Sequence, residues 1–319
     1  IKSSAASDVY KRQSLNTCAV RVNESYGSAA SYNYMVEKLG FTTLTQRDSQ
    51  QSGNMGLGGY DVGVTTEEMA AAYAAIANDG VYTKPRTWLR VEDSEGNVVM
   101  ENETSAHSAM KETTAYLLRD ILESVITSGT GTEAYFSGMT IAGKTGTTDD
   151  NRDRYFVGFS PYYCAAVWTG YESNDELSYG MGNGSAQLWK QVMREIHADL
   201  EDKGFDSCTG LTQVTVCSDS GLLATDACTK DLRGSRVRTV TVAADTAPTA
   251  TCNVHKMVDY CTEGKHIATQ YCPKDKVKQV AVLDWNRALF NDIKARDHEY
   301  LLKVLDGSAT PNDPKDDIC

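Results

Sequence analysis

The chain has 319 residues, of which 41% are hydrophobic and 23% charged, a composition that excludes an intrinsically disordered protein. Its formal net charge of -12 argues against a nucleic-acid partner. No apolar run approaches the roughly 18 residues that a membrane-spanning helix needs. The first thirteen residues contain no apolar signal-peptide core. We therefore expect any export signal to lie upstream of residue 1.

The first residues look unrelated to the rest of the protein. Residues 3–13 have the sequence SSAASDVYKRQ, which resembles the in-frame translation of a transposon-type sequencing adaptor. The alternative is a natural polar tail. We interpret residues 1–13 as an artefact, so that genuine protein begins near Ser14.

The next part of the chain predicts helices around a glycine-rich loop. A helical stretch over residues 35–39 stops at Gly40, and residues 50–63 form the loop. Threonines and acidic residues at 65–68 are typical of a helix start. The Ala-rich helix that follows is predicted to end at Gly80, since glycine favours the position after a helix.

A hairpin and a longer helix come next. Residues 87–99 alternate apolar and polar side chains around Asp93-Ser94-Glu95-Gly96, which indicates a hairpin. Residues 111–126 carry apolar side chains at helical spacing.

Three short strands and a closing helix complete the predicted first domain. The strands are expected over residues 140–148, 155–159 and 163–171, and the amphipathic helix over 185–200. Short strands joined by polar turns favour antiparallel neighbours. The pattern predicts an α+β fold, a partial antiparallel sheet with flanking helices, over residues 14–203.

A cysteine-rich extension over residues 204–305 contains an internal repeat of 44 residues, and we expect the polar residues 306–319 to form a flexible tail. Three cysteines recur at this offset: Cys208, Cys217 and Cys228 return as Cys252, Cys261 and Cys272. We expect two small modules, residues 208–228 and 252–272, each too short to hold a core without covalent help.

Disulfides and a metal site are the two ways in which these cysteines could stabilise the modules. Six cysteines allow 15 pairings, among which we favour Cys217 with Cys228 and Cys261 with Cys272. The zinc alternative would draw on Cys252, His255, Cys261, His266 and Cys272. These cysteines do not form tight Cys-x-x-Cys pairs, and neither histidine has a counterpart in the first repeat. The sequence therefore predicts disulfides, and neither a metal nor a cofactor.

The segment Lys144-Thr145-Gly146-Thr147-Thr148 combines the groups that would hold an anionic acyl substrate. Lysine supplies positive charge, and threonine hydroxyls can donate hydrogen bonds to a carboxylate. Glycine lets a substrate backbone approach, and a backbone N–H can point at a developing oxyanion. Taken alone, Lys-Thr-Gly is more often a plain turn.

A second polar cluster is Ser14-Leu15-Asn16. In an extended loop the serine and the asparagine would project to the same side. A helix cap or a turn is the alternative interpretation, because both residue types favour such positions.

Together, the two clusters resemble the second and third signatures of the serine transpeptidase and β-lactamase superfamily, Ser-x-Asn and Lys-Thr-Gly, in the family's order. Further segments resemble one branch, the bifunctional class A penicillin-binding proteins. They are Ser14 to Val20, Leu57 to Gly59 with Gly63 to Thr66, Gly129 to Thr132, Asp153 with Tyr155 to Phe159, and Val167 to Tyr171. One departure is Tyr155, where the family usually carries tryptophan.

The resemblance implies roles for individual residues. Ser14 would relay a proton to the leaving amine, and Asn16 would hold the amide carbonyl of the stem peptide. Lys144 would set the positive field and support proton transfer through Ser14. Thr145 and Thr147 would bind the terminal carboxylate of the substrate, with Gly146 and Thr148 completing the substrate-binding segment. The Thr147 N–H would form half of an oxyanion hole.

The family's nucleophile, the serine of a Ser-x-x-Lys motif, should precede Ser-x-Asn. The only such motif runs from Ser108 to Lys111, in the wrong order, and we interpret Ser108 as a helix cap. We expect the true motif upstream of Ser14, together with the first strands of the sheet, a glycosyltransferase domain and a membrane anchor. The polypeptide of 319 residues is accordingly predicted to be inactive.

The function implied by the resemblance is peptidoglycan cross-linking by a D,D-transpeptidase, through a serine acyl-enzyme that penicillin traps. The expected partners are D-Ala-D-Ala stem peptides and β-lactam antibiotics, at the extracellular face of the bacterial cytoplasmic membrane. A β-lactamase or D,D-carboxypeptidase of the same superfamily is one alternative. A non-catalytic binding module of the cell envelope is another.

Overall fold

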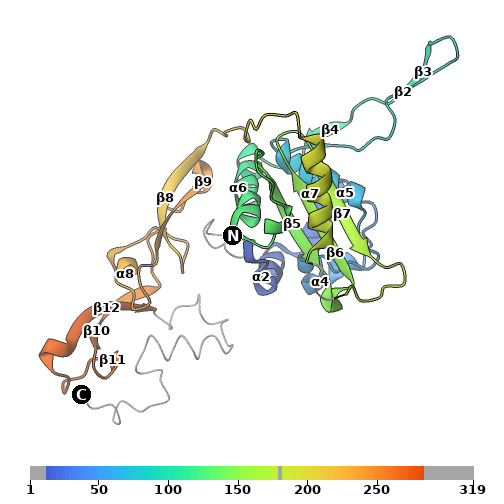
Figure 1. The fold of residues 1–319 in the computed structure, drawn as a ribbon. Helices are drawn as coiled ribbons and strands as arrows, with labels where there is room; N and C mark the ends of the chain where they lie inside the picture. Colours follow the sequence, from blue (N-terminus) through green and yellow to red (C-terminus); the bar gives the residue numbers. More distant parts are fainter. Residues whose placement is uncertain (1–11, 179–181, 284–319) are drawn as a thin grey trace. The chain divides into compact units, whose positions relative to one another are not determined.

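The computed structural model describes residues 12–178 and 182–283 (Figure 1). The chain divides between Gly210 and Leu211 into two compact units. The boundary falls seven residues after the change in composition near residue 204, so Cys208 belongs to the first unit. None of the described helices is both long enough and apolar enough to span a membrane.

The first unit alternates helices with short strands. Its first half contains α2 (Asn16–Tyr26), α3 (Ser28–Leu39), the 3-10 turn η1 (Asp48–Gln50), α4 (Ser52–Leu57), α5 (Thr66–Ala77), β1 (Val81–Thr83), β2 (Arg90–Glu92), β3 (Val98–Glu101) and β4 (Ala106–Ser108). Its second half contains α6 (Glu112–Ser128), η2 (Thr132–Ala134), β5 (Ala142–Thr147), η3 (Asp149–Asn151), β6 (Asp153–Phe159), β7 (Cys164–Gly170) and α7 (Gly184–Ile196).

Most predicted elements of this unit are confirmed, with one correction. The hairpin, the helices at 111–126 and 185–200, and the three antiparallel strands are all present. The glycine-rich segment 50–63 was predicted to be a loop, but α4 lies within it. Met55 explains the helix, because it is buried against Phe41 and Ala72 and so repays the cost of ordering two glycines.

The sheet has the order β5-β6-β7, with all neighbours antiparallel. Successive side chains of a strand point to opposite faces, so Phe156 and Phe159 of β6 are buried on different sides. Phe156 packs edge-on against Trp189 of α7, with ring centroids 5.1 Å apart. Phe159 packs in a cluster with Leu122 of α6 and with residues of α5. The sheet therefore has helices on both faces, which fixes the position of β5 (Figure 1).

Two glycines adapt β5 and β6 to this packing. A Cβ on Gly143 would lie 2.7 Å from Phe156 Cζ, and one on Gly158 would lie 3.0 Å from Trp189 Cζ2. Side chains at these positions would push the aromatic core out of place, since so close an approach is strongly repulsive. Gly143 in β5 and Gly158 in β6 thus serve core packing.

Helix α5 starts where the sequence predicted, and the structure shows that its start is a capping box. Thr65 accepts a hydrogen bond from the Glu68 N–H at 3.1 Å, and the Glu68 carboxylate accepts one from the Thr65 N–H at 2.9 Å. The same carboxylate accepts four more from Thr42 and Thr43, at 2.6–3.3 Å. Glu68 is therefore a buried anchor that joins the segment after α3 to the start of α5.

The second unit repeats one supersecondary pattern. It contains β8 (Leu211–Cys217), α8 (Asp226–Thr229), β9 (Val237–Ala243), η4 (Ala244–Thr246), β10 (His255–Cys261), β11 (His266–Ile267), η5 (Lys274–Lys276) and β12 (Val277–Leu283). Strand β10 begins and ends 44 residues after β8, at the offset seen in the sequence. In both repeats this strand pairs antiparallel with the long strand that follows, β9 or β12.

Candidate active site

The two polar clusters of the sequence meet in the first unit. The Lys144 ammonium donates a hydrogen bond to Ser14 Oγ at 2.9 Å, across 130 residues of sequence. It donates another to the carbonyl of Thr145, also at 2.9 Å. The side chains of Ser14 and Lys144 are thus within direct proton-transfer distance of each other.

Lys144 is placed by the edge strand of the sheet. In the described part of the chain, β5 pairs only with β6, through Lys144 opposite Val157 and Gly146 opposite Tyr155. The other edge of β5 keeps its backbone N–H and C=O groups available to an added strand. A Cβ on Gly146 would lie 3.1 Å from Tyr155 Cβ on the paired strand, so a larger residue at this position would crowd Tyr155.

Ser14 lies at a turn and not in the extended loop that we predicted. Its φ is 55°, in the left-handed region, and Asn16 begins helix α2 two residues later. The two side chains are exposed, so both are open to solvent near the start of this helix. The structure places Ser14 beside Lys144, and it gives Asn16 no side-chain hydrogen bond among the described residues.

Thr130 lies beside the lysine-threonine segment, although it was not among the predicted site residues. Its hydroxyl is hydrogen-bonded to the hydroxyl of Thr145 at 2.8 Å. A Cβ on Gly131 would lie 2.9 Å from Ile126 Cδ1, so the turn that carries Thr130 sits tightly on the end of α6. The signal in the sequence was the Gly-Thr-Gly-Thr turn itself, which resembled the class A family but was given no individual site residue.

Hydrogen bonds to Asp153 hold the end of β5 in place. Thr148 donates its hydroxyl to Asp153 Oδ2 at 3.1 Å and accepts from the Asp153 N–H at 2.8 Å. Trp168 donates its indole N–H to Asp153 Oδ1 at 2.9 Å. Thr148 therefore holds the β5–β6 turn, whereas Thr147 is the last, exposed residue of β5. Tyr155, at the family's tryptophan position, donates its hydroxyl to the carbonyl of Val64 at 3.3 Å.

Ser108, the serine of the Ser-x-x-Lys motif, is not a helix cap, contrary to our interpretation. Ser108 ends β4, and its hydroxyl donates to the carbonyl of Met110 at 3.4 Å. The cap position of α6 is Lys111, which has no capping side-chain bond. Ser108 is held by the β1–β4 pair, through Val81, and makes no described hydrogen bond to β5.

The structure also contradicts the predicted disulfides. Cys217, Cys228 and Cys272 carry thiols, so neither the Cys217–Cys228 nor the Cys261–Cys272 bond is formed. The physical reason for the first pair is that Cys217 and Cys228 converge with Cys252 and His255 on one point, and not on each other alone.

The chain matches two known protein families. Residues 11–194, more than half of the chain, match the family described as "Penicillin binding protein transpeptidase domain". Residues 207–257 match "Penicillin-binding protein 1A, C-terminal domain".

Two curated relatives are clostridial. The chain is 33% identical over 241 residues to penicillin-binding protein 1A of Clostridium perfringens, an alignment that covers 75% of this chain and 28% of that protein. It is 29% identical over 302 residues to penicillin-binding protein 1A of Clostridium botulinum, covering 94% and 36%. The chain thus spans about a third of the length of these relatives.

Solved structures share the fold. Penicillin-binding protein 1A from Haemophilus influenzae superposes with a TM-score of 0.61 at 20% identity, over 77% of this chain and 41% of that chain. An imipenem acyl-enzyme complex of penicillin-binding protein A from Mycobacterium tuberculosis gives a TM-score of 0.50 at 21% identity, over 59% and 47%. By its family match, the chain belongs to the penicillin-binding protein transpeptidase family, with relatives among the class A enzymes named penicillin-binding protein 1A.

Proposed function

We propose that residues 14–203 form the Ser-x-Asn and Lys-Thr-Gly half of a D,D-transpeptidase site that cross-links peptidoglycan through a serine acyl-enzyme. The observation that carries the proposal is the hydrogen bond of 2.9 Å between Lys144 Nζ and Ser14 Oγ. This hydrogen bond joins the Ser-x-Asn and Lys-Thr-Gly segments, and the match of residues 11–194 to the transpeptidase family supports this chemistry for the pair.

In this site the Lys144–Ser14 pair moves protons. A fixed ammonium lowers the cost of removing the Ser14 proton, so the hydroxyl can pass a proton between the acyl-enzyme chemistry and the leaving amine. Asn16 lies two residues after Ser14, at the start of α2, where its side-chain amide would hold the carbonyl of the stem peptide. Ser14 and Asn16 act as proton relay and substrate holder, and neither is the nucleophile.

The edge of β5 binds the substrate's anionic end. An extended peptide can add to this edge as a further strand, with backbone hydrogen bonds to β5. Thr145, oriented by Thr130, and Thr147 would donate their hydroxyls to the terminal carboxylate, beside the positive charge of Lys144. The Thr147 N–H would be one oxyanion donor, and such a donor contributes about 3 kcal/mol in the transition state.

The partners follow from this chemistry. D-Ala-D-Ala stem peptides and β-lactams share a carboxylate next to a reactive amide, which fits the threonines and lysine of β5. The mycobacterial neighbour is described as an acyl-enzyme with imipenem, which supports β-lactams as ligands of this fold. We place the site at the extracellular face of the cytoplasmic membrane, where such substrates occur.

Penicillin acylation of a chimera tests the proposal. Residues 14–203 replace the matching segment of the Clostridium perfringens protein, which supplies the family's Ser-x-x-Lys serine. The chimera is expected to be labelled by a fluorescent penicillin, and its serine-to-alanine control is not. The 319-residue chain alone is expected to stay unlabelled, since its one Ser-x-x-Lys motif lies on β4.

The possible results separate the candidate functions. A folded chimera that takes no label would reject the half-site, and so favour a non-catalytic envelope-binding module. Rapid loss of the label by hydrolysis would favour a β-lactamase or carboxypeptidase, because these enzymes admit water to the acyl-enzyme. A labelled band from the 319-residue chain alone would show that the nucleophile lies within it.

A further inference from the structure

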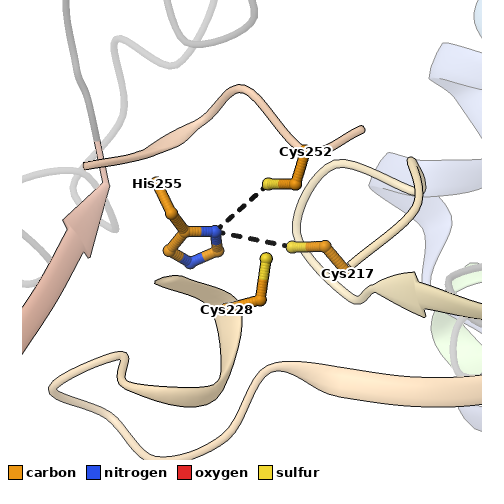
Figure 2. A group of neighbouring side chains, drawn as sticks. All are labelled: Cys217, Cys228, Cys252 and His255. Atoms are coloured by element: carbon orange, nitrogen blue, oxygen red, sulfur yellow. Dashed lines mark hydrogen bonds between the residues drawn. The ribbon is translucent and has the colours of Figure 1, made fainter. Parts of the chain in front are cut away.

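Four potential metal ligands converge inside the second unit. They are Cys217 at the end of β8, Cys228 in α8, Cys252 in the loop between η4 and β10, and His255 at the start of β10 (Figure 2). Their three sulfur atoms and one imidazole nitrogen all lie within 4.8 Å of one another. The three cysteines are buried, and the side chain of His255 is fully buried.

The spacing of these atoms fits a tetrahedral zinc ion. With bonds of about 2.3 Å to sulfur and 2.0 Å to nitrogen, tetrahedral ligands lie roughly 3.5–3.8 Å apart. His255 Nδ1 lies 3.3 Å from Cys252 Sγ and 3.6 Å from Cys217 Sγ. The side chains point toward one common centre (Figure 2).

The far nitrogen of His255 is fixed by a buried carboxylate, as in many zinc sites. His255 Nε2 lies 2.8 Å from Asp231 Oδ2 and 3.3 Å from Asp219 Oδ2. A histidine whose outer N–H donates to a carboxylate presents its other nitrogen as a lone pair, which is the form that binds a metal. Such a partner sets the tautomer and raises the basicity of the ligand.

Two arginines neutralise the two carboxylates beside the cluster. Arg233 contacts Asp231 at 2.9 Å and Asp219 at 2.7 Å, and Arg236 contacts Asp219 at 3.1 Å. The two acids and two arginines therefore cancel. Three thiolates and a neutral imidazole would then carry a charge that a divalent cation largely neutralises.

Disulfide formation explains this arrangement less well than a metal does. Three thiols at one point cannot all pair, and the third would remain buried beside His255. A metal uses all four groups. Cys252 and His255 also form a tight Cys-x-x-His pair, and short spacings of this kind are typical of zinc ligands.

We propose that Cys217, Cys228, Cys252 and His255 bind a structural zinc ion that joins the two cysteine repeats. Cys217 and Cys228 belong to the first repeat, whereas Cys252 and His255 lead into β10 of the second. This explains why His255 has no counterpart 44 residues earlier: one site is assembled from both repeats. Four protein ligands leave no open position, so the role is structural and not catalytic. The ion would replace the covalent help that so small a unit needs.

Metal analysis of the whole 319-residue chain tests the inference. The reduced protein is reconstituted with zinc, freed of excess, and assayed for bound metal by mass spectrometry. Cys252→Ser is expected to bind about one zinc ion fewer per chain than the wild type. Cys18→Ser, a change in α2 of the first unit, should bind as much as the wild type. An unchanged zinc content in Cys252→Ser would overturn the proposal.

Two further measurements keep the test independent of misfolding. Cobalt added to the wild-type chain should give the absorption of a tetrahedral thiolate site, and its absence would contradict the proposal. Asp231→Asn leaves all four ligands in place and should weaken zinc binding about 10–100-fold. Wild-type protein with Cys217 and Cys228 in a disulfide, shown by peptide mass after reconstitution, would also reject the site.

Discussion

Replacing Lys144 with alanine in the chimera is expected to lower the rate of penicillin acylation by about 10²–10⁴-fold. The change removes the only cation that contacts Ser14 Oγ among the described residues, and with it the positive field beside the carboxylate-binding threonines. Ser14 would keep its hydroxyl but lose the partner that makes proton transfer easy. Second-order acylation rates with a fluorescent penicillin measure the effect.

Lys84→Ala is the matched control for this variant. Lys84 is an exposed lysine in the same unit, just after β1, and its backbone N–H donates a hydrogen bond to the carbonyl of Ser105. Its loss removes the same charge without touching β5, so the acylation rate should stay within about twofold of the chimera. If Lys144→Ala acylates as fast as Lys84→Ala, then Lys144 has no part in the site.

Glu68→Gln is expected to destabilise the first unit by about 3 kcal/mol at neutral pH. Burial alone would raise the pKa of Glu68, but hydrogen bonds from Thr65, Thr42 and Thr43 outweigh it and lower the pKa to about 2. An acid with a lowered pKa in the folded state stabilises the fold above its unfolded pKa, near 4.5. That contribution is lost as the pH falls from about 5 toward 2.

Urea denaturation of the wild type and of Glu68→Gln at pH 7, 5 and 3.5 measures this dependence. The difference in unfolding free energy should shrink as the pH falls, because protonated Glu68 resembles glutamine. Glu67→Gln serves as the control, since Glu67 is the exposed neighbour in the same helix turn. A difference that is constant with pH would show that the carboxylate charge does not stabilise the unit.

Periodicity and local chemistry predicted most of the fold. The capping box at Thr65, the stop at Gly40 and the three strands around Lys144 depend on neighbouring residues, so they are visible in sequence. Helix α4 was missed because its glycines disfavour a helix, and only the burial of Met55 offsets that preference. Tertiary packing decided that element.

The candidate site shows the same division. Ser14 and Lys144 were predicted from short motifs in a familiar order, and the structure brings their side chains together. Thr130 was missed because the Gly-Thr-Gly-Thr motif marks a turn but does not show that its threonine contacts Thr145. The prediction that Ser14 lies in an extended loop was also wrong, because a left-handed φ at a serine depends on the surrounding turn.

The cysteines were the hardest feature to predict. A repeat of 44 residues invites pairing within each module, yet the structure groups cysteines from both modules with His255. Spacing along the chain does not reveal such a cluster, because it forms where the end of β8 meets the start of β10. The offset of 44 residues recurs in β8 and β10, whereas the grouping of cysteines from both repeats with His255 was not predicted.

The central claim is that Ser14, Lys144 and the threonines of β5 grip one carboxylate-bearing acyl ligand. A crystal structure of the penicillin-acylated chimera tests it most directly. We predict that the ligand carboxylate accepts hydrogen bonds from the hydroxyls of Thr145 and Thr147, with Ser14 Oγ still bonded to Lys144 Nζ. A bound penicillin whose carboxylate lies away from β5, with Ser14 and Lys144 apart, would contradict the account.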